Sequence, residues 1–116
     1  MKVGVAQIDI TPQVPVWMTG YANRDHKSEG AYAPLNAGAV YLQGASDGAL
    51  ILTADVIGYT APYDAEVRQA IADVTGLLPR QIVLTATHTH CAPFLSQWNM
   101  PGEVELEYAA WLLERD

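Results

Sequence analysis

The sequence is poor in cysteine and in positive charge. Cys91 is the only cysteine among 116 residues, so no disulfide can form within the chain and nothing indicates an oxidising compartment. Six lysines and arginines stand against thirteen acidic residues, which gives a formal net charge of −7. Binding to a phosphate backbone needs clustered basic residues, and the six here are scattered along the chain. We therefore expect neither a nucleic-acid partner nor an anionic membrane surface.

Long hydrophobic runs are also missing. No apolar stretch approaches the roughly 20 residues of a membrane-spanning helix. Residues 1–10 alternate polar and apolar positions and lack the apolar core of a signal peptide. Half of the residues are nonetheless apolar and only 16% are charged, which is typical of a folded domain and not of a disordered chain. As it stands, the chain is expected to be soluble and cytoplasmic.

The first half of the chain predicts strands and one long loop. Residues 1–10 are typical of a strand whose alternation breaks near Gln7. Residues 16–33 have no period and predict a long loop, which in a compact domain is usually functional. The apolar runs 35–43 and 49–56 predict a hairpin around the turn formers of 44–48. The second run is almost wholly apolar, which predicts a central strand buried on both faces.

The second half predicts a strand–helix–strand unit. A helix is expected from Thr60 or Ala61, with Pro62 in its first turn and Gly76 as its left-handed cap. A second buried strand follows at 81–85, so residues 49–85 form a parallel unit with a right-handed crossover. Residues 103–115 predict a C-terminal helix whose apolar stripe is Val104, Tyr108, Trp111 and Leu112. The fold class is therefore α/β, with a mixed sheet, a β-hairpin, a strand–helix–strand unit and a C-terminal helix.

Two histidines follow the second buried strand, in the stretch Thr-His-Thr-His. His88 and His90 are spaced i, i+2, and on an extended segment both imidazoles would share one face. They follow the C-terminal end of a parallel strand, where ligands gather in α/β sheets. A neutral imidazole is a common zinc ligand, so the pair is a candidate for a metal or catalytic site. The spacing alone is equally compatible with two exposed loop histidines.

A zinc site needs three or four protein ligands. The remaining candidates include His26, Asp55 and Cys91, and none completes a known ligand spacing. Either residues outside this chain complete the site, or there is no metal site. Asp55 ends its strand beside His88 and is a candidate to hold the tautomer of that imidazole, or else to cap the next turn. Cys91 is expected to be a small buried thiol rather than a nucleophile.

The long loop supplies a candidate glycine. Gly20 either allows close approach of a ligand to the backbone or provides a positive φ angle. This loop and the loop after the histidines contain four aromatic residues, Trp17, Tyr21, Phe94 and Trp98. They either line an apolar substrate groove or seal the loops onto the core, and the second role is the more usual for such residues.

Four segments, taken in order, resemble the N-terminal part of the neutral/alkaline (non-lysosomal) ceramidase family. Residues 3–12 end in Asp-Ile-Thr-Pro like the opening strand of that family, and 18–23 are similar to its Met-x-Gly-Tyr loop. Residues 51–58 resemble its strand ending in an aspartate. The sequence LTATHTHCAP, residues 84–93, is similar to its Ala-Thr-His-Thr-His-Ser-Gly-Pro signature and is the most specific of the four.

The resemblance implies that residues 1–116 form the N-terminal portion of a larger catalytic domain. That domain would be a zinc-dependent hydrolase that cleaves an N-acyl amide, ceramide or a related lipid amide, with metal-activated water. By position, His88 would bind Zn²⁺, His90 would contact the substrate or the developing oxyanion, and Gly20 would lie against the substrate head group. The remaining metal ligands of the family, a histidine, a glutamate and a tyrosine, come from later in the chain. Related enzymes are often secreted or membrane-associated, so export is expected if a leader precedes this sequence.

The chain also departs from the family pattern. Residues 91–95, Cys-Ala-Pro-Phe-Leu, replace Ser-Gly-Pro-Gly-Gly, and residues 30–32, Gly-Ala-Tyr, replace Gly-Ile-His. A groove of different shape is expected, which suits another amide or ester as well as ceramide. Two alternatives to the enzyme stay open: a non-catalytic domain that binds a ligand or partner, and a structural fragment whose exposed surfaces need the rest of a longer chain.

Overall fold

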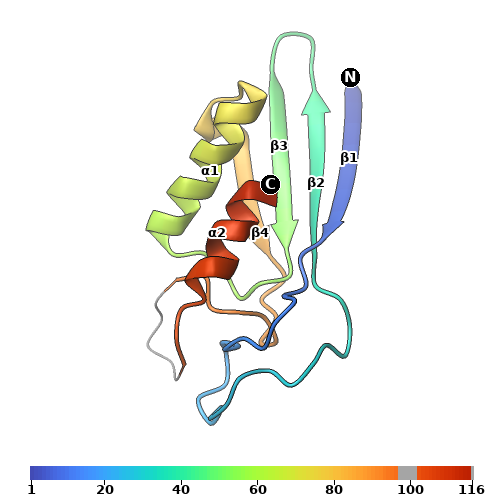
Figure 1. The fold of residues 1–116 in the computed structure, drawn as a ribbon. Coiled ribbons are helices and arrows are strands. Elements are labelled where there is room, and N and C mark those ends of the chain that lie inside the picture. Colours follow the sequence, from blue (N-terminus) through green and yellow to red (C-terminus); the bar gives the residue numbers. More distant parts are fainter. Residues whose placement is uncertain (97–101, 116) are drawn as a thin grey trace.

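The computed structural model describes residues 1–96 and 102–115, which form a four-stranded sheet with two helices against one face (Figure 1). The strand order is β1-β2-β3-β4, with β1–β2 and β2–β3 antiparallel and β3–β4 parallel. The predicted mixed α/β fold, with a hairpin, a strand–helix–strand unit and a C-terminal helix, is confirmed. The elements are β1 (Lys2–Asp9), β2 (Asn36–Gln43), β3 (Gly48–Ala54), α1 (Ala61–Thr75), a 3-10 turn η1 (Pro79–Gln81), β4 (Ile82–Ala86) and α2 (Leu106–Arg115).

Helix α1 begins and ends where the sequence predicts. Thr60 precedes it in an extended conformation, and Pro62 lies in the first turn, where its missing N–H leaves no hydrogen bond unmade. Gly76 follows the helix with a φ of 75°, and its N–H donates to the carbonyl of Ala72 at 2.9 Å. This left-handed cap turns the chain back toward β4.

The core lies between the sheet and the two helices. Ile82 of β4 is fully buried, and Val67 and Ile71 of α1 are 2% exposed. Burying one such aliphatic side chain contributes roughly 1.5–3 kcal/mol. Helix α2 is attached by two tyrosine hydroxyls: Tyr63 donates to the carbonyl of Ala109 at 3.0 Å, and Tyr108 donates to the carbonyl of Ile10 at 2.5 Å.

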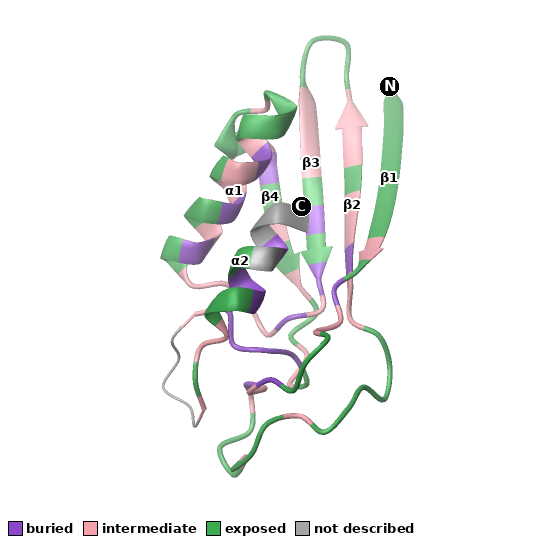
Figure 2. Ribbon diagram, viewed as in Figure 1, coloured by how far each residue is buried: buried purple, intermediate pink, exposed green. Residues whose placement is uncertain are grey.

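The prediction that β3 is buried on both faces is wrong for the described residues. The side of the sheet that faces away from the helices carries a straight row across all four strands, Val5–Val40–Ile51–Val83, fixed by the strand register. The exposed fractions of these four side chains are 78%, 37%, 39% and 47%. In Figure 2, exposed and buried residues alternate toward the end of β3, as expected for a strand that is covered on one face. We call these four residues the open-face row.

Strand β1 is regular over its whole length, and helix α2 begins later than predicted. The predicted change of face near Gln7 is present in the apolar side chains, while the backbone of all eight residues pairs regularly with β2. The apolar side chains change face along the strand because Ile8 packs against the core while Val3 and Val5 are exposed. Helix α2 begins at Leu106 rather than at residue 103, because Glu105 is engaged with residues of two other loops.

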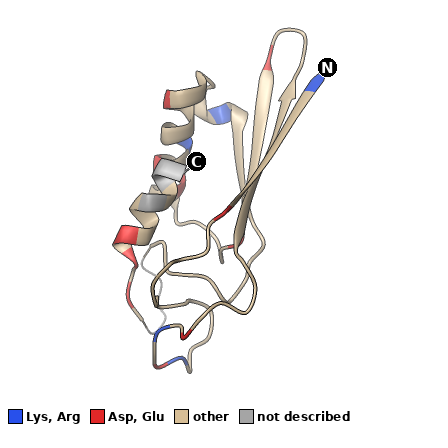
Figure 3. Ribbon diagram, turned by 45° about the vertical axis from the view of Figure 1, so that its right-hand side comes forward, with Lys and Arg blue, Asp and Glu red and all other residues tan. Residues whose placement is uncertain are grey.

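Charge is sparse on the sheet and scattered elsewhere. Lys2 and Asp9 of β1 are the charged residues of the four strands, and Figure 3 shows no basic cluster on the described elements. The helices of residues 1–96 and 102–115 include none with the length and hydropathy to cross a bilayer.

Candidate functional site

The loops that follow β3 and β4 meet the long loop after β1 at one end of the sheet (Figure 1). Met18 forms an isolated antiparallel bridge with Pro93, and the N–H of Thr19 donates to the carbonyl of Ala92 at 3.0 Å. The N–H of His88 donates to the carbonyl of Val56, also at 3.0 Å. These backbone bonds hold the segment that carries the two histidines between the other two loops.

His88 has a strained backbone, and one nitrogen of its ring is hydrogen-bonded to a backbone carbonyl. Its φ of 62° makes it the non-glycine residue with positive φ in the described part of the chain, a conformation that costs roughly 1–2 kcal/mol. Nδ1 of its imidazole lies 2.7 Å from the carbonyl oxygen of Ile57. Because a carbonyl only accepts, Nδ1 carries the hydrogen, and the lone pair of the neutral ring lies on Nε2. Strain of this kind is typical of functional sites.

His90 lies beside His88, although not for the predicted reason. Strand β4 ends at Ala86, so the two histidines do not share a face of an extended strand. The left-handed turn at His88 instead brings the ring centroids to 5.0 Å, with the ring planes at 75°. His88 is exposed and His90 is half-buried, so the pair borders solvent.

Gly20 packs directly on His90. It has a φ of 115°, and a β-carbon built on it would lie 2.5 Å from Cγ of His90. The positive φ that the sequence offered as one explanation for this glycine is confirmed, and the group that closely approaches its backbone here is an imidazole. The predicted contact of Gly20 with a substrate head group stays a prediction.

Two further residues of the long loop contact the site: Tyr21, which the sequence places in a flanking loop, and Arg24, which no motif marks. The ring of Tyr21 lies edge-on to His90 with centroids 5.0 Å apart. The guanidinium of Arg24 lies 5.2 Å from the centroid of Tyr21, and its Nη1 donates to the carbonyls of Thr19 at 3.2 Å and His90 at 3.0 Å. Spacing could not reveal these contacts, because Arg24 and His90 are 66 residues apart.

The predicted partner of His88, Asp55, is engaged elsewhere. Its carboxylate accepts from the N–H of Asn36 at 2.8 Å and thereby caps the start of β2. The position at Nδ1 of His88 that we expected Asp55 to occupy is taken by the Ile57 carbonyl. A role of Asp55 in orienting the imidazole of His88 stays a prediction.

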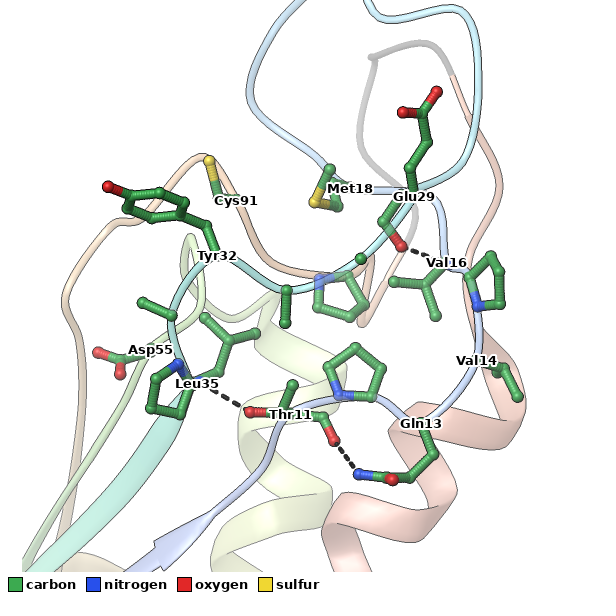
Figure 4. A pocket seen from close by; sticks show the side chains of 18 of the residues that line it. Thr11, Gln13, Val14, Val16, Met18, Glu29, Tyr32, Leu35, Asp55 and Cys91 are labelled. Atoms are coloured by element: carbon green, nitrogen blue, oxygen red, sulfur yellow. Dashed lines mark hydrogen bonds between the residues drawn. The ribbon is translucent and has the colours of Figure 1, made fainter.

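Cys91 is exposed, so the predicted buried thiol is wrong. The adjacent Ala92 takes the inward position and is fully buried, which leaves the cysteine side chain at the surface. Cys91 and Thr89 border a cavity of about 810 Å³ that lies between the two arms of the long loop (Figure 4). The arms are joined by bonds between Val16 and Ser28, whose backbone N–H groups donate to the Ser28 hydroxyl and the Val16 carbonyl, respectively. The histidines do not line this cavity, which is walled mostly by apolar residues such as Met18, Tyr32 and Leu35.

Two of the aromatic residues seal the loops onto the core, as predicted, whereas a substrate groove lined by such residues stays a prediction. Phe94 is 1% exposed, and Gly102 packs closely against both Phe94 and Trp17, so these rings seal the loops onto the core. Tyr21 is 52% exposed and borders the histidines. Trp98 and the side chain of Trp111 lie outside the described part of the structure.

The described residues do not form a complete metal site. Residues 1–96 and 102–115 contain no group of three histidine, cysteine or acidic side chains placed to hold an ion. Nε2 of His88 is oriented by the bond at Nδ1 in the manner of a metal-binding imidazole. One imidazole is fewer than the three or four protein ligands that a zinc site needs.

The fold matches part of a known enzyme. No protein-family model matches the chain. Among solved structures, neutral ceramidase from Pseudomonas aeruginosa is 24% identical, with a TM-score of 0.68 over 78% of this chain. A ceramidase complexed with C2 gives the same values. This chain covers 15% of the length of each. The predicted resemblance is confirmed at the level of the fold: the sheet and helices are similar to one part of a larger ceramidase structure.

Proposed function

We propose that this chain is part of a zinc-dependent hydrolase of the neutral ceramidase type, which cleaves an N-acyl amide. The observation that carries the proposal is the conformation of His88. Its backbone is strained, its Nδ1 donates to the Ile57 carbonyl, and its Nε2 is left with the lone pair. The centroid of its ring lies 5.0 Å from that of a second histidine, His90. The shared fold with ceramidase supports it.

Each residue has a role in this proposal. His88 would hold a zinc ion through Nε2, and such an ion would act as a Lewis acid that lowers the pKa of bound water to about 7. His90 contacts the substrate and donates a hydrogen bond where negative charge develops on the scissile carbonyl. Gly20 gives His90 the space to lie against the loop backbone, and Asp55 holds the end of β3 against β2 beside the site.

Three histidine variants of the full-length protein test the proposal. His88→Ala should lose zinc and hydrolysis of a ceramide with a fluorescent acyl chain. His90→Ala should keep zinc and lose activity roughly 10²–10³-fold, as expected for loss of an oxyanion donor. His26→Ala is the matched control, because His26 lies on an exposed loop and should leave both unchanged. Unchanged zinc content and activity in His88→Ala would overturn the proposal.

The second candidate is a non-catalytic domain that binds an apolar ligand. The cavity of about 810 Å³ favours it, because neither histidine lines that space and its walls are mostly apolar side chains. Metal analysis of the intact protein distinguishes the two functions: the enzyme requires about one zinc ion per chain, whereas the binding domain requires none.

A further inference from the structure

We infer that Arg24 is a positioning residue of the candidate site, which fixes where the imidazole of His90 lies. The inference rests on the proposed function for its effect on catalysis and on contacts in the structure for its effect on His90. Arg24 belongs to the long loop, and its guanidinium contacts three groups that meet at the histidine segment.

The first contact joins two loops. Nη1 of Arg24 has two hydrogens, which suits donation to two carbonyls at once, and it lies 3.2 Å from the Thr19 carbonyl and 3.0 Å from the His90 carbonyl. Thr19 is 1% exposed, and its own N–H donates to Ala92. Arg24 therefore links Thr19, the residue before Gly20, to His90 and holds the two loops together beside the contact between Gly20 and His90.

The second contact acts on the ring itself. The guanidinium lies over one face of Tyr21, and the edge-on packing of Tyr21 against His90 limits how that imidazole can rotate. Gly20 closes another side of the same ring. The ring of His90 thus contacts Gly20, Tyr21 and His88. Arg24 contacts the segment that supplies the first two, through the Thr19 carbonyl and the Tyr21 ring.

An arginine suits this position, because two hydrogens on Nη1 are combined with a planar cation that packs on an aromatic face. A glutamine is shorter and carries no charge, so it keeps an amide donor and loses the packing on Tyr21. Removing the guanidinium leaves the Thr19 and His90 carbonyls without this donor and frees the Tyr21 ring. A displacement of about 1 Å in a catalytic group can lower a rate roughly 100-fold.

Arg24→Gln in the full-length protein tests the inference, with Arg80→Gln as the control because Arg80 is exposed in η1 on another part of the fold. We expect kcat to fall roughly 10- to 100-fold, with zinc content retained. By NMR, the ring-proton shifts of His90 should change and its nuclear Overhauser contact with Tyr21 should weaken. Arg80→Gln should leave all of these unchanged.

A purely structural role predicts a different result. It would lower the melting temperature of Arg24→Gln and leave the His90 signals and the kcat of the folded protein unchanged, which would overturn the inference. If Arg24→Gln does not fold, Tyr21→Leu carries the test, because Tyr21 is half exposed and its loss should shift the same His90 signals; unchanged signals there would overturn it. If the wild-type protein hydrolyses no amide, the proposed function fails, and the NMR comparison still decides whether Arg24 positions His90.

Discussion

The backbone of Gly20 lies against the imidazole of His90, so closely that a β-carbon at residue 20 would come within 2.5 Å of Cγ of that ring. These residues come from loops that are separated by three strands and a helix. The contact makes the position of one candidate catalytic group depend on the absence of a side chain at another residue. It also gives the glycine a physical reason that does not require a bound ligand.

Gly20→Ala should therefore displace His90 and destabilise the protein. The added methyl group must push the ring aside, and the φ of 115° disfavours any β-carbon, so we expect a loss of about 1–3 kcal/mol in the free energy of unfolding. Gly30→Ala is the control in the same loop, because a β-carbon at Gly30 would meet nothing within 4 Å. Urea unfolding of both variants checks this; equal stabilities would show that His90 does not pack on Gly20.

The left-handed backbone at His88 predicts an unusual order of stability among substitutions. His88→Gly and His88→Ala both lose the imidazole and its bond to Ile57, but only alanine retains the strain of a positive φ. The glycine variant should be more stable than the alanine variant by about 1 kcal/mol, after allowance for the greater freedom of glycine in the unfolded chain. Chemical denaturation of the pair measures the difference. An alanine variant that is as stable as the glycine variant would contradict the strain.

A pH-dependent ion pair lies in the exposed part of the long loop. Nδ1 of His26 is 2.6 Å from the carboxylate of Asp25, and this hydrogen bond is the main reason that the pKa of His26 is raised above 6.5 and that of Asp25 is lowered below 3.8. Glu29 adds to the rise in the pKa of His26, and Arg24 opposes it. The contribution of His26 to stability is complete below its unfolded pKa and is lost as pH rises through its folded pKa. The contribution of Asp25 is present above its unfolded pKa and is lost as pH falls.

Asp25→Asn should lower the pKa of His26 toward its ordinary value, and high salt should do the same in the wild type because both side chains are exposed. NMR titration of the His26 ring protons measures it. Asp47→Asn, in the turn between β2 and β3, is the control and should leave the titration unchanged. A His26 pKa that does not respond to Asp25→Asn would show that the pair does not form in solution.

The parts of the fold that local sequence determines could be predicted. Pro62 and Gly76 mark the ends of α1 because each suits one terminal position of a helix. The parallel pairing of β3 and β4 follows from the helix between them, since a crossover is needed to join parallel strands. Burial was harder to predict, because an apolar strand such as β3 looks the same in sequence whether one face or both are covered.

The site could be predicted only in part, for a similar reason. The histidine pair is visible in sequence, and its location at the C-terminal end of β4 follows from the fold. The means of bringing the rings together is not visible, because it depends on a positive φ at His88 rather than on strand alternation. Arg24 and Ile57 act through backbone carbonyls, and any residue type can offer a carbonyl, so no motif marks these contacts.

The open-face row predicts that residues 1–116 associate when they are produced alone. The strands carry almost no charge, and they present adjacent apolar side chains from Val5, Val40, Ile51 and Val83. Such a patch favours contact with another apolar surface.

Replacing both Ile51 and Val83 by threonine keeps two β-branched residues in the strands while adding hydroxyls. It should lower the apparent mass toward that of the 12.6 kDa monomer without unfolding the sheet. Val74→Thr, an exposed position on α1 away from the sheet, should leave association unchanged. Sedimentation of the three proteins gives the answer. Monomeric wild-type residues 1–116 would contradict the idea that this face needs a covering layer, and equal effects of the α1 and sheet substitutions would assign the association to general surface hydrophobicity.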